Sequence, residues 1–363
     1  MRPILPAMLS CSGLKLTDEE KYFFSRINPL GINLFGRNIN NKTQLQKLVD
    51  EIKNVINRED VLLALDQEGG RVQRLTAPEY PNYAAAITLG KLPLNQAKRA
   101  AEIHAALIAH DLNEIGLNLN YAPVLDLCYP NTTEALRSRC FSADEQTVAV
   151  LGRCETDTYM ANGIVPCIKH IPGHGRAQTD PHLGLPRIAA PLNQLQNDFY
   201  PFRQLCDCPL AMTAHIVISA VDDKNPVTHS AKAIQQIIRQ QIGFDNLLLS
   251  DAIDMKALQG SAGDKAARAI SAGCDAICYA LGDMAEMQDI AANLPPMSDK
   301  SLERFAKTAK IIHNTNKQQN WLALTAEYNL LIGDIPPYRE TYDATEVLNH
   351  LLPQQKQEGD KPC

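Results

Sequence analysis

A repeating order of amphipathic helix, glycine and apolar strand is the feature that most constrains the fold of this chain. Residues 42–57 carry aliphatic side chains at helical spacing, and the apolar run 61–65 follows them. Four further repeats place a glycine where the helix is expected to end, at Gly116, Gly163, Gly243 and Gly273. Strands that alternate with helices form a parallel sheet through right-handed crossovers. The chain is therefore expected to be an α/β protein.

The number of strands and the residues that follow them favour a closed barrel. Strands are expected at roughly 30–36, 61–66, 117–127, 163–170, 209–217, 246–251 and 274–280. An eighth is expected near residues 1–8 or within 310–340. Several of these runs are closed by polar side chains, namely Asp66, Asp126, Lys169–His170, His215 and Asp251. Because barrel enzymes build their sites from the carboxyl ends of several strands, we expect a single (β/α)8 TIM-type barrel rather than a doubly wound sheet.

Length and charge limit the remaining possibilities. The 363 residues suffice for one large domain, expected over residues 1–340, with residues 341–363 as a helix end and a disordered polar tail. The net charge of −6, without a basic block, argues against nucleic acid or an anionic membrane as partner. No apolar run approaches the roughly 18 residues of a spanning helix. The ten cysteines form no framework, which indicates reduced thiols and the cytoplasm.

The segment from Lys169 to Pro186 holds the densest group of titratable side chains. It contains His170, His174 and His182 together with Asp180, and glycines punctuate it. An apolar run, residues 163–168, leads directly into it. A loop that a buried strand holds in place is a common position for catalytic residues. We therefore expect part of the active site here.

Two other motifs also follow buried strands. In Asp66-Gln-Glu-Gly-Gly-Arg-Val-Gln-Arg74, the aspartate can accept hydrogen bonds from hydroxyl groups of a ligand, or it can stand at a helix N-terminus. Asp251 follows the run 246–249, where an ionised carboxylate could attack an electrophilic sugar carbon. The alternative role at this place is a helix N-cap, for which Asp254 is the better candidate.

Together these motifs resemble glycoside hydrolase family 3, and within it the NagZ-type β-N-acetylglucosaminidases. The resemblance runs from about residue 25 to residue 285. The two most specific elements are the Asp66–Arg74 run and Lys-His-x-Pro-Gly-His-Gly at residues 169–175. Further matching elements are Leu34–Asn38, Ala122–Asp126, Arg139, Asp180–His182, Ala214–His215, Gly243–Asp245 and Ser250–Asp251.

The resemblance implies a retaining exo-glycosidase with Asp251 as nucleophile and an Asp180–His182 pair as the acid/base. An imidazole titrates near neutral pH, and a carboxylate on its other nitrogen fixes the tautomer. The residues that the family implies for holding a terminal N-acetylglucosamine are Asp66, Arg74, Arg139, Lys169 and His170. His174 and His215 are implied as supporting residues, and no metal or cofactor is implied.

The implied substrate is a small carbohydrate from the cell wall, N-acetylglucosamine linked to 1,6-anhydro-N-acetylmuramic acid with or without peptide, and the implied role is peptidoglycan recycling in a bacterium. The expected assembly is a monomer or a weak homodimer. Three alternatives stay open: phosphorolysis at the same site, a metal-dependent barrel hydrolase, and a sugar-binding module without activity.

Overall fold

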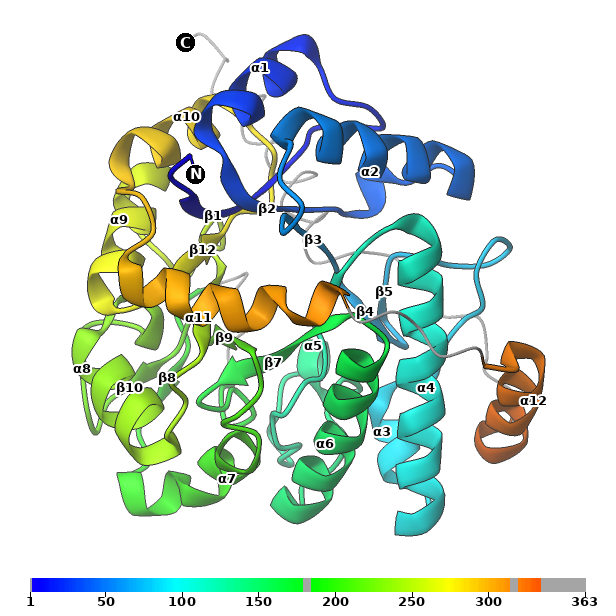
Figure 1. The fold of residues 1–363 in the computed structure, drawn as a ribbon. Helices are drawn as coiled ribbons and strands as arrows, with labels where there is room; N and C mark the ends of the chain where they lie inside the picture. The colour runs from blue at the N-terminus through cyan, green and yellow to red at the C-terminus, as the bar shows by residue number, and fades with distance from the viewer. Residues whose placement is uncertain (1, 179–183, 314–318, 334–363) are drawn as a thin grey trace, which may run out of the picture.

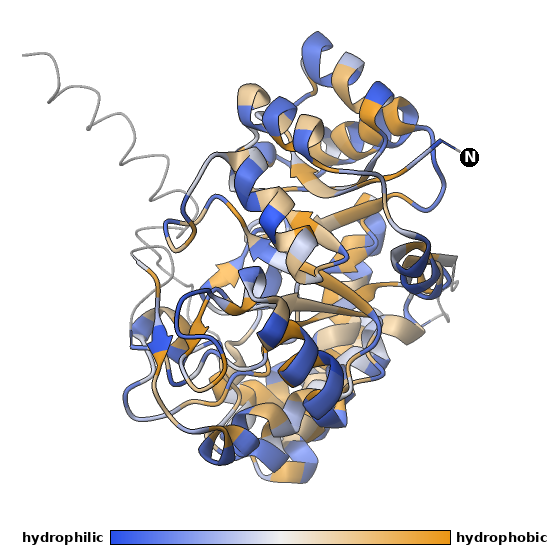
Figure 2. Ribbon diagram, turned by 90° about the vertical axis from the view of Figure 1, so that its left-hand side faces the viewer, coloured by the Kyte–Doolittle hydropathy of each residue, from blue (hydrophilic) through white to orange (hydrophobic). Residues whose placement is uncertain are grey.

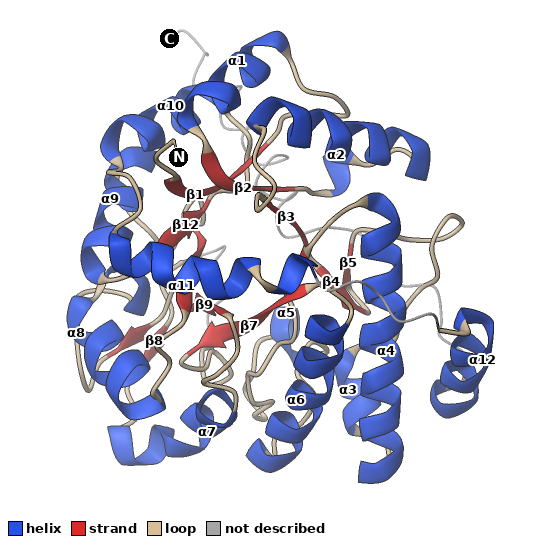
Figure 3. Ribbon diagram, viewed as in Figure 1, coloured by secondary structure: helices blue, strands red, loops and turns tan. Residues whose placement is uncertain are grey.

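Eight parallel strands close into a barrel in the computed structural model, which describes residues 2–178, 184–313 and 319–333 (Figures 1 and 3). Around the barrel the order is β1-β12-β11-β9-β7-β6-β3-β2. The bounds are β1 (Leu5–Ser10), β2 (Pro29–Asn33), β3 (Leu62–Leu65), β6 (Leu119–Asn120), β7 (Val165–Ile171), β9 (Leu210–Thr213), β11 (Leu247–Ala252) and β12 (Ala276–Cys278). The expected (β/α)8 barrel is confirmed, and β1 is its eighth strand.

Helices surround the strands on the outside of the barrel (Figure 3). The α-helices are α1 (Asp18–Ile27), α2 (Lys42–Ile56), α3 (Ala86–Gly90), α4 (Leu94–Ile115), α5 (Glu134–Arg137), α6 (Glu145–Ala161), α7 (Gln196–Gln204), α8 (Ala231–Ala233), α9 (Ala262–Ala272), α10 (Met284–Asn293), α11 (Asp299–Ala309) and α12 (Trp321–Ile332). α8 continues into the π-helical η4 (Ile234–Ile242), and short 3₁₀ turns are η1 (Gly36–Asn38), η2 (Leu192–Leu195), η3 (Val227–His229) and η5 (Ile311–His313).

The core has two parts, one inside the barrel and one between the strands and the helices. Alternate strand residues point inward or outward, so each strand supplies both parts. Met8, Leu62 and Cys167 belong to the inner part, and Phe305 of α11 joins them. Figure 1 shows α11 lying across one end of the barrel, and Figure 2 shows the apolar residues gathered on the strands. Helix α11 therefore closes the end where the strands begin.

The strand after α4 is much shorter than expected. The apolar run 117–127 gives only Leu119–Asn120 as β6, followed by one isolated bridge from Val124 to Lys169. Pro123 interrupts the ladder because it has no amide hydrogen to donate. The chain beyond β6 nevertheless stays hydrogen-bonded to β7 as far as Leu125, whose amide donates to the Lys169 carbonyl.

Two small sheets extend the barrel at its carboxyl end. β4 (Gln67–Gly69) and β5 (Val72–Gln73) form a hairpin directly after β3, while β8 (Arg187–Ile188) pairs with β10 (Val217–Ile218). The expected tail, residues 341–363, lies outside the described residues. In the part of the chain that the structure describes, no helix combines the length and the apolar character needed to cross a membrane.

Candidate active site

A buried network of four charged side chains lies at the carboxyl end of the barrel. The Lys169 ammonium, on β7, is 2.9 Å from Asp66 Oδ1 and 2.6 Å from Glu68 Oε1. Arg139 donates two hydrogen bonds to the Glu68 carboxylate, each 2.8 Å long. Arg74 lies at the edge of this network, 3.7 Å from Asp66 Oδ2. The structure therefore brings together four of the five residues expected to hold the sugar and adds Glu68.

Mutual attraction keeps this network charged although it is buried. Burial alone would raise the pKa of Glu68, but Arg139 and Lys169 lower it to about 2. Burial would likewise lower the pKa of Lys169, yet Asp66 and Glu68 hold it above its ordinary value. Opposite charges at hydrogen-bonding distance favour the ionised forms of both partners. The network therefore presents fixed charges at neutral pH.

The Asp66 motif begins a hairpin, and the alternative of a helix N-terminus is wrong. β4 and β5 turn through Gly69 and Gly70, whose φ angles are +92° and +60°. A Cβ on Gly69 would come within 2.4 Å of the Ala84 carbonyl oxygen. Only glycine fits such a close approach in this backbone conformation. The tight turn places Asp66 and Glu68 beside Lys169.

A second network joins the strand β7 to the loop after β6. His170 Nδ1 is 2.7 Å from Asp126 Oδ2, and the His174 amide donates a 2.6 Å hydrogen bond to Asp126 Oδ1. Burial would raise the pKa of Asp126, but the two histidines hold it below its ordinary value. Because an ionised carboxylate only accepts, His170 donates to Asp126 through Nδ1.

His174 is an exception among the buried polar side chains. Its ring lies 5.9 Å from that of His170, and within the described residues neither of its nitrogens has a hydrogen-bond partner. Burial lowers the pKa of His174 to about 4, so the ring is neutral. A buried polar group without a partner costs free energy, and such groups in native proteins call for an explanation. A ligand in the barrel mouth would supply the missing partner.

Asp251 is the next-to-last residue of β11 and is 8% exposed. Its Oδ1 accepts a 2.8 Å hydrogen bond from the Ala252 amide. His215, fully buried, contacts the Ala252 carbonyl with Nε2 at 3.0 Å and the Thr228 hydroxyl with Nδ1 at 2.7 Å. Both ring nitrogens of His215 thus bond to protein groups, and the ring braces the backbone beside Asp251.

Asp254 does not cap a helix, so that expectation is wrong. Its Oδ1 accepts a 2.8 Å hydrogen bond from the Ala280 amide, after β12. Helix α9 begins only at Ala262, and Ser261 is its N-cap. Asp254 therefore ties the turn after β11 to the next strand.

Asp66 and Asp251 lie near the same part of the barrel interior. Cys167 and Cys278 both belong to the inner core. Burial raises the pKa of each thiol, and the charges of Asp66 and Asp251 raise both further. The two carboxylates therefore lie near the same pair of interior thiols, although they come from β3 and β11.

Two buried residues behind the site were not expected from the sequence. His104 on α4 contacts the Glu68 carbonyl oxygen with Nε2 at 3.0 Å, and its Nδ1 is 2.8 Å from the Tyr328 hydroxyl on α12. Glu155 on α6 borders a cavity of about 10 Å³ that Glu68 and Arg139 also line. Burial, followed by the charge of Glu68, raises the pKa of Glu155 well above its ordinary value. These contacts hold the Glu68 hairpin from behind.

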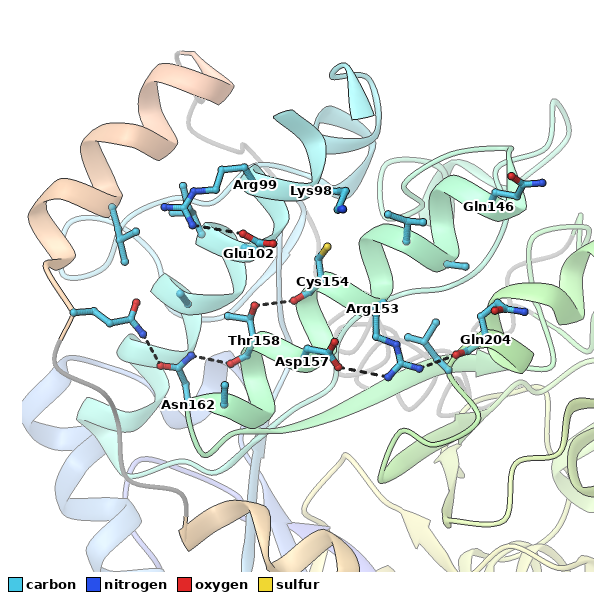
Figure 4. Close-up of a pocket in the computed structure, with 18 of the residues that line it drawn as sticks. Lys98, Arg99, Glu102, Gln146, Arg153, Cys154, Asp157, Thr158, Asn162 and Gln204 are labelled. Carbon is cyan, nitrogen blue, oxygen red and sulfur yellow. Dashed lines mark hydrogen bonds and ion pairs between the residues drawn. The ribbon is translucent and has the colours of Figure 1, made fainter. Parts of the chain in front are cut away.

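A larger pocket lies outside the barrel, between α4, α6, α7 and α12 (Figure 4). Its volume is about 860 Å³. Arg153 pairs there with Asp157 and Asp207, and Arg99 pairs with Glu327. These side chains neutralise one another, and none follows a barrel strand. The barrel mouth is the better candidate for chemistry.

Asp180 and His182 lie outside the described residues, so the structure does not test the expected acid/base pair. The chain on either side is described: β7 and His174 precede them, and β8 follows. Among the described residues, no group of three or more His, Cys, Asp or Glu side chains could hold a metal ion.

Comparison with known proteins places this geometry in one family. The sequence profile described as glycosyl hydrolase family 3 N terminal domain matches residues 7–306. A β-hexosaminidase of Bordetella avium is 33% identical over 313 residues, which is 84% of this chain and 85% of that protein. The crystal structure of native NagZ from Neisseria gonorrhoeae matches with a TM-score of 0.80 and 29% identity, over 92% of this chain and 99% of that one. The same enzyme in complex with N-trifluoroacetyl-D-glucosamine gives a TM-score of 0.80 and 28% identity, with the same coverage.

Proposed function

Because this chain belongs to glycosyl hydrolase family 3 and is a glycoside hydrolase, we propose that it is a retaining exo-β-N-acetylglucosaminidase. The observation that carries the proposal is the set of buried charges at the barrel mouth. Asp66 directly follows β3, while Lys169 and Asp251 lie within two residues of the ends of β7 and β11, and among the described residues the buried ring of His174 has no hydrogen-bond partner. Relatives named β-hexosaminidase and NagZ support the same substrate class.

Asp251 is the nucleophile in this proposal. Its carboxylate attacks the anomeric carbon of the terminal sugar and forms a covalent glycosyl-enzyme while the bond to the leaving group breaks. His182, steered by Asp180, gives a proton to the departing oxygen. The imidazole then takes a proton from water, whose oxygen displaces Asp251. The sugar is released with its configuration retained.

The charged networks hold the sugar in this proposal. Asp66 accepts hydrogen bonds from sugar hydroxyl groups, while Arg74, Arg139, Lys169 and His170 donate or accept around the same ring. Arg139 already gives two hydrogen bonds to Glu68, so it acts from a fixed position. His174 gains a partner when the pocket fills, and His215 keeps Asp251 in place. No metal or cofactor takes part.

The natural substrate in this proposal is N-acetylglucosamine linked to 1,6-anhydro-N-acetylmuramic acid, with or without peptide, taken up during cell-wall recycling in the cytoplasm. The enzyme acts on this small carbohydrate as a monomer or a weak homodimer. It acts without a nucleic-acid or membrane partner.

Product analysis tests the reaction type. An aryl β-N-acetylglucosaminide is incubated with and without phosphate, and the first sugar product is followed by proton NMR. The proposal predicts free N-acetylglucosamine that appears first as the β-anomer in both buffers. Sugar phosphate as the main product in phosphate buffer would mean phosphorolysis, and an initial α-anomer would exclude a retaining hydrolase.

A further inference from the structure

Two cysteines stand at the two ends of the loop that follows β6. The Cys128 amide donates a 2.9 Å hydrogen bond to the Ser142 carbonyl, which closes the loop at its base. Their sulfurs lie against neighbouring carbonyls of α5, with Cys128 Sγ 3.9 Å from Arg137 O and Cys140 Sγ 3.4 Å from Leu136 O. Cys140 also belongs to a small buried cluster with Val124 and Leu136, and Cys128 packs against this cluster. They are thus free cysteines positioned as a pair.

The two thiols differ in exposure and in acidity. Cys128 is half-buried, whereas Cys140 is buried. The hydrogen bond from Cys140, together with the Arg137 guanidinium, lowers the pKa of Cys128 to about 6. The same hydrogen bond and burial raise the pKa of Cys140 well above its ordinary value. Because the thiolate is the reactive form, Cys128 is suited to react first and Cys140 to react second.

The loop between these cysteines contacts both sides of the active site. The Thr132 hydroxyl donates a 2.7 Å hydrogen bond to the Gly175 carbonyl, and Arg176 donates a 3.0 Å hydrogen bond to the Tyr129 hydroxyl. The Arg176 guanidinium also lies 4.4 Å from the centre of the Tyr129 ring. Arg139, directly before Cys140 in the chain, holds Glu68 by two hydrogen bonds. A change at the base of the loop therefore reaches the sugar-binding network.

We propose that Cys128 and Cys140 form a redox-active dithiol, which a peroxide oxidises to an intramolecular disulfide that slows glycoside hydrolysis. The Cys128 thiolate attacks a peroxide oxygen, an S–O bond forms, and the O–O bond breaks to release water after protonation. The Cys140 thiol then attacks the sulfenic sulfur, the S–S bond forms, and a second water leaves. Two thiols are oxidised by two electrons, and one peroxide is reduced to two waters.

Formation of the disulfide slows hydrolysis because it moves the backbone beside Arg139. A disulfide holds its two sulfurs about 2 Å apart, whereas these cysteines are free, so the ends of the loop shift when the bond forms. A displacement of about an ångström in a positioned group reduces turnover by on the order of tenfold to a hundredfold. Formation of the disulfide does not depend on the proposed function. Its effect on the rate of hydrolysis rests on the proposed active site at the barrel mouth. Disulfide formation and turnover are therefore measured separately.

The test treats the full-length enzyme with increasing hydrogen peroxide and maps the cysteine peptides by mass spectrometry without reduction. The wild type and a C206S control should yield a peptide pair linked through Cys128 and Cys140, and activity should fall as the linked fraction rises. Dithiothreitol should restore both. C128S should keep its activity under the same treatment, and C140S should trap a sulfenic acid on Cys128 that reacts with dimedone.

Two results would overturn this inference. If the wild type shows no link between Cys128 and Cys140 while peroxide is consumed, the pair is not a redox-active dithiol. If the link forms fully and turnover is unchanged, the disulfide does not control the active site. Peptide mapping on the wild type decides the first point even if a variant folds poorly.

Discussion

The two ends of the barrel both contain buried charges, but among the described residues the two sets of charges differ in their hydrogen bonding. At the amino end, Asp275 precedes β12 and accepts hydrogen bonds on both carboxylate oxygens. The donors are Arg239, Arg304, the Ser301 hydroxyl and the Leu248 amide, at distances from 2.7 to 3.0 Å. All of these partners are protein groups, and α11 covers this end. The cluster therefore has a structural role.

At the carboxyl end, similar ion pairs occur together with a buried histidine that has no hydrogen-bond partner among the described residues. Lys169 and Arg139 neutralise Glu68, yet His174 is buried with no hydrogen-bond partner among the described residues. In (β/α)8 barrels the amino end generally supports stability, and the carboxyl end carries the chemistry. Buried charge alone therefore does not identify an active site. At the carboxyl end a buried imidazole lacks a hydrogen-bond partner among the described residues, whereas every member of the Asp275 cluster has one.

The largest effect on activity is expected from Asp251→Asn. The variant keeps the volume of the side chain but removes the carboxylate that we propose as nucleophile, so turnover should fall by about four orders of magnitude. Thermal unfolding should remain close to that of the wild type. Asp254→Asn is the matched control, because Asp254 accepts a backbone hydrogen bond three residues away. Retention of a tenth of wild-type turnover in Asp251→Asn would remove Asp251 from its role.

A selective loss is expected from His182→Ala. If His182 is the general acid as proposed, the variant should lose on the order of a hundredfold or more on the proposed disaccharide substrate, whose sugar leaving group needs a proton. An activated nitrophenyl glycoside should lose much less. His170→Ala is the comparison, because loss of a sugar contact should weaken both substrates alike. Equal losses on both substrates in His182→Ala would exclude the acid role.

At the amino end, Asp275→Asn should lower stability and leave chemistry intact. Breaking a buried ion pair costs about 3–5 kcal/mol of unfolding free energy, because the remaining charges lose their partner. Urea unfolding measures this cost, and kcat is compared well below the unfolding temperature. Glu303→Gln on the exposed side of α11 is the control and should change little. A large fall in kcat without loss of stability would contradict the division between the two ends.

The smallest effect is a pH dependence that Glu155 controls. Burial raises its pKa well above the ordinary value of 4.5 in the folded state, so unfolding releases a proton at pH values between the unfolded-state and folded-state pKa. The contribution of Glu155 to stability is therefore complete below about pH 4.5 and declines as pH rises towards the folded-state pKa, by about 1.4 kcal/mol per pH unit. Glu155→Gln should remove this slope in urea unfolding between about pH 5 and 8. An identical slope in both proteins would show that Glu155 is ionised in the folded state.

The sequence predicted well those features that depend on local pattern. The apolar runs before Asp66 and Asp251 became the barrel strands β3 and β11, whereas the run before Asp126 formed a strand only at Leu119–Asn120. The hairpin after Asp66 was not distinguishable from a helix start, because acidic residues and glycines suit both. Asp254 was misjudged for a similar reason, since nothing nearby shows that the next helix begins only at Ala262.

The features that the sequence could not reveal depend on contacts between distant residues. Glu68 acquires its role from Arg139 and Lys169, which lie far along the chain. His104 lies on the buried face of α4, where the sequence alone predicts an ordinary core residue. Its contact with the Tyr328 hydroxyl on α12 is seen only in the fold. The closed amino-end cluster around Asp275 likewise joins η4, α11 and two strands. Only the folded chain brings these groups together.

The central claim is that Asp251 at the carboxyl end of the barrel forms a covalent bond to the sugar. A fluorinated N-acetylglucosaminyl fluoride slows breakdown of such an intermediate more than its formation, so the labelled enzyme accumulates. Peptide mapping by mass spectrometry then locates the sugar. The account predicts one label per chain, on Asp251. A label on another residue, or rapid turnover with no labelled enzyme, would contradict it.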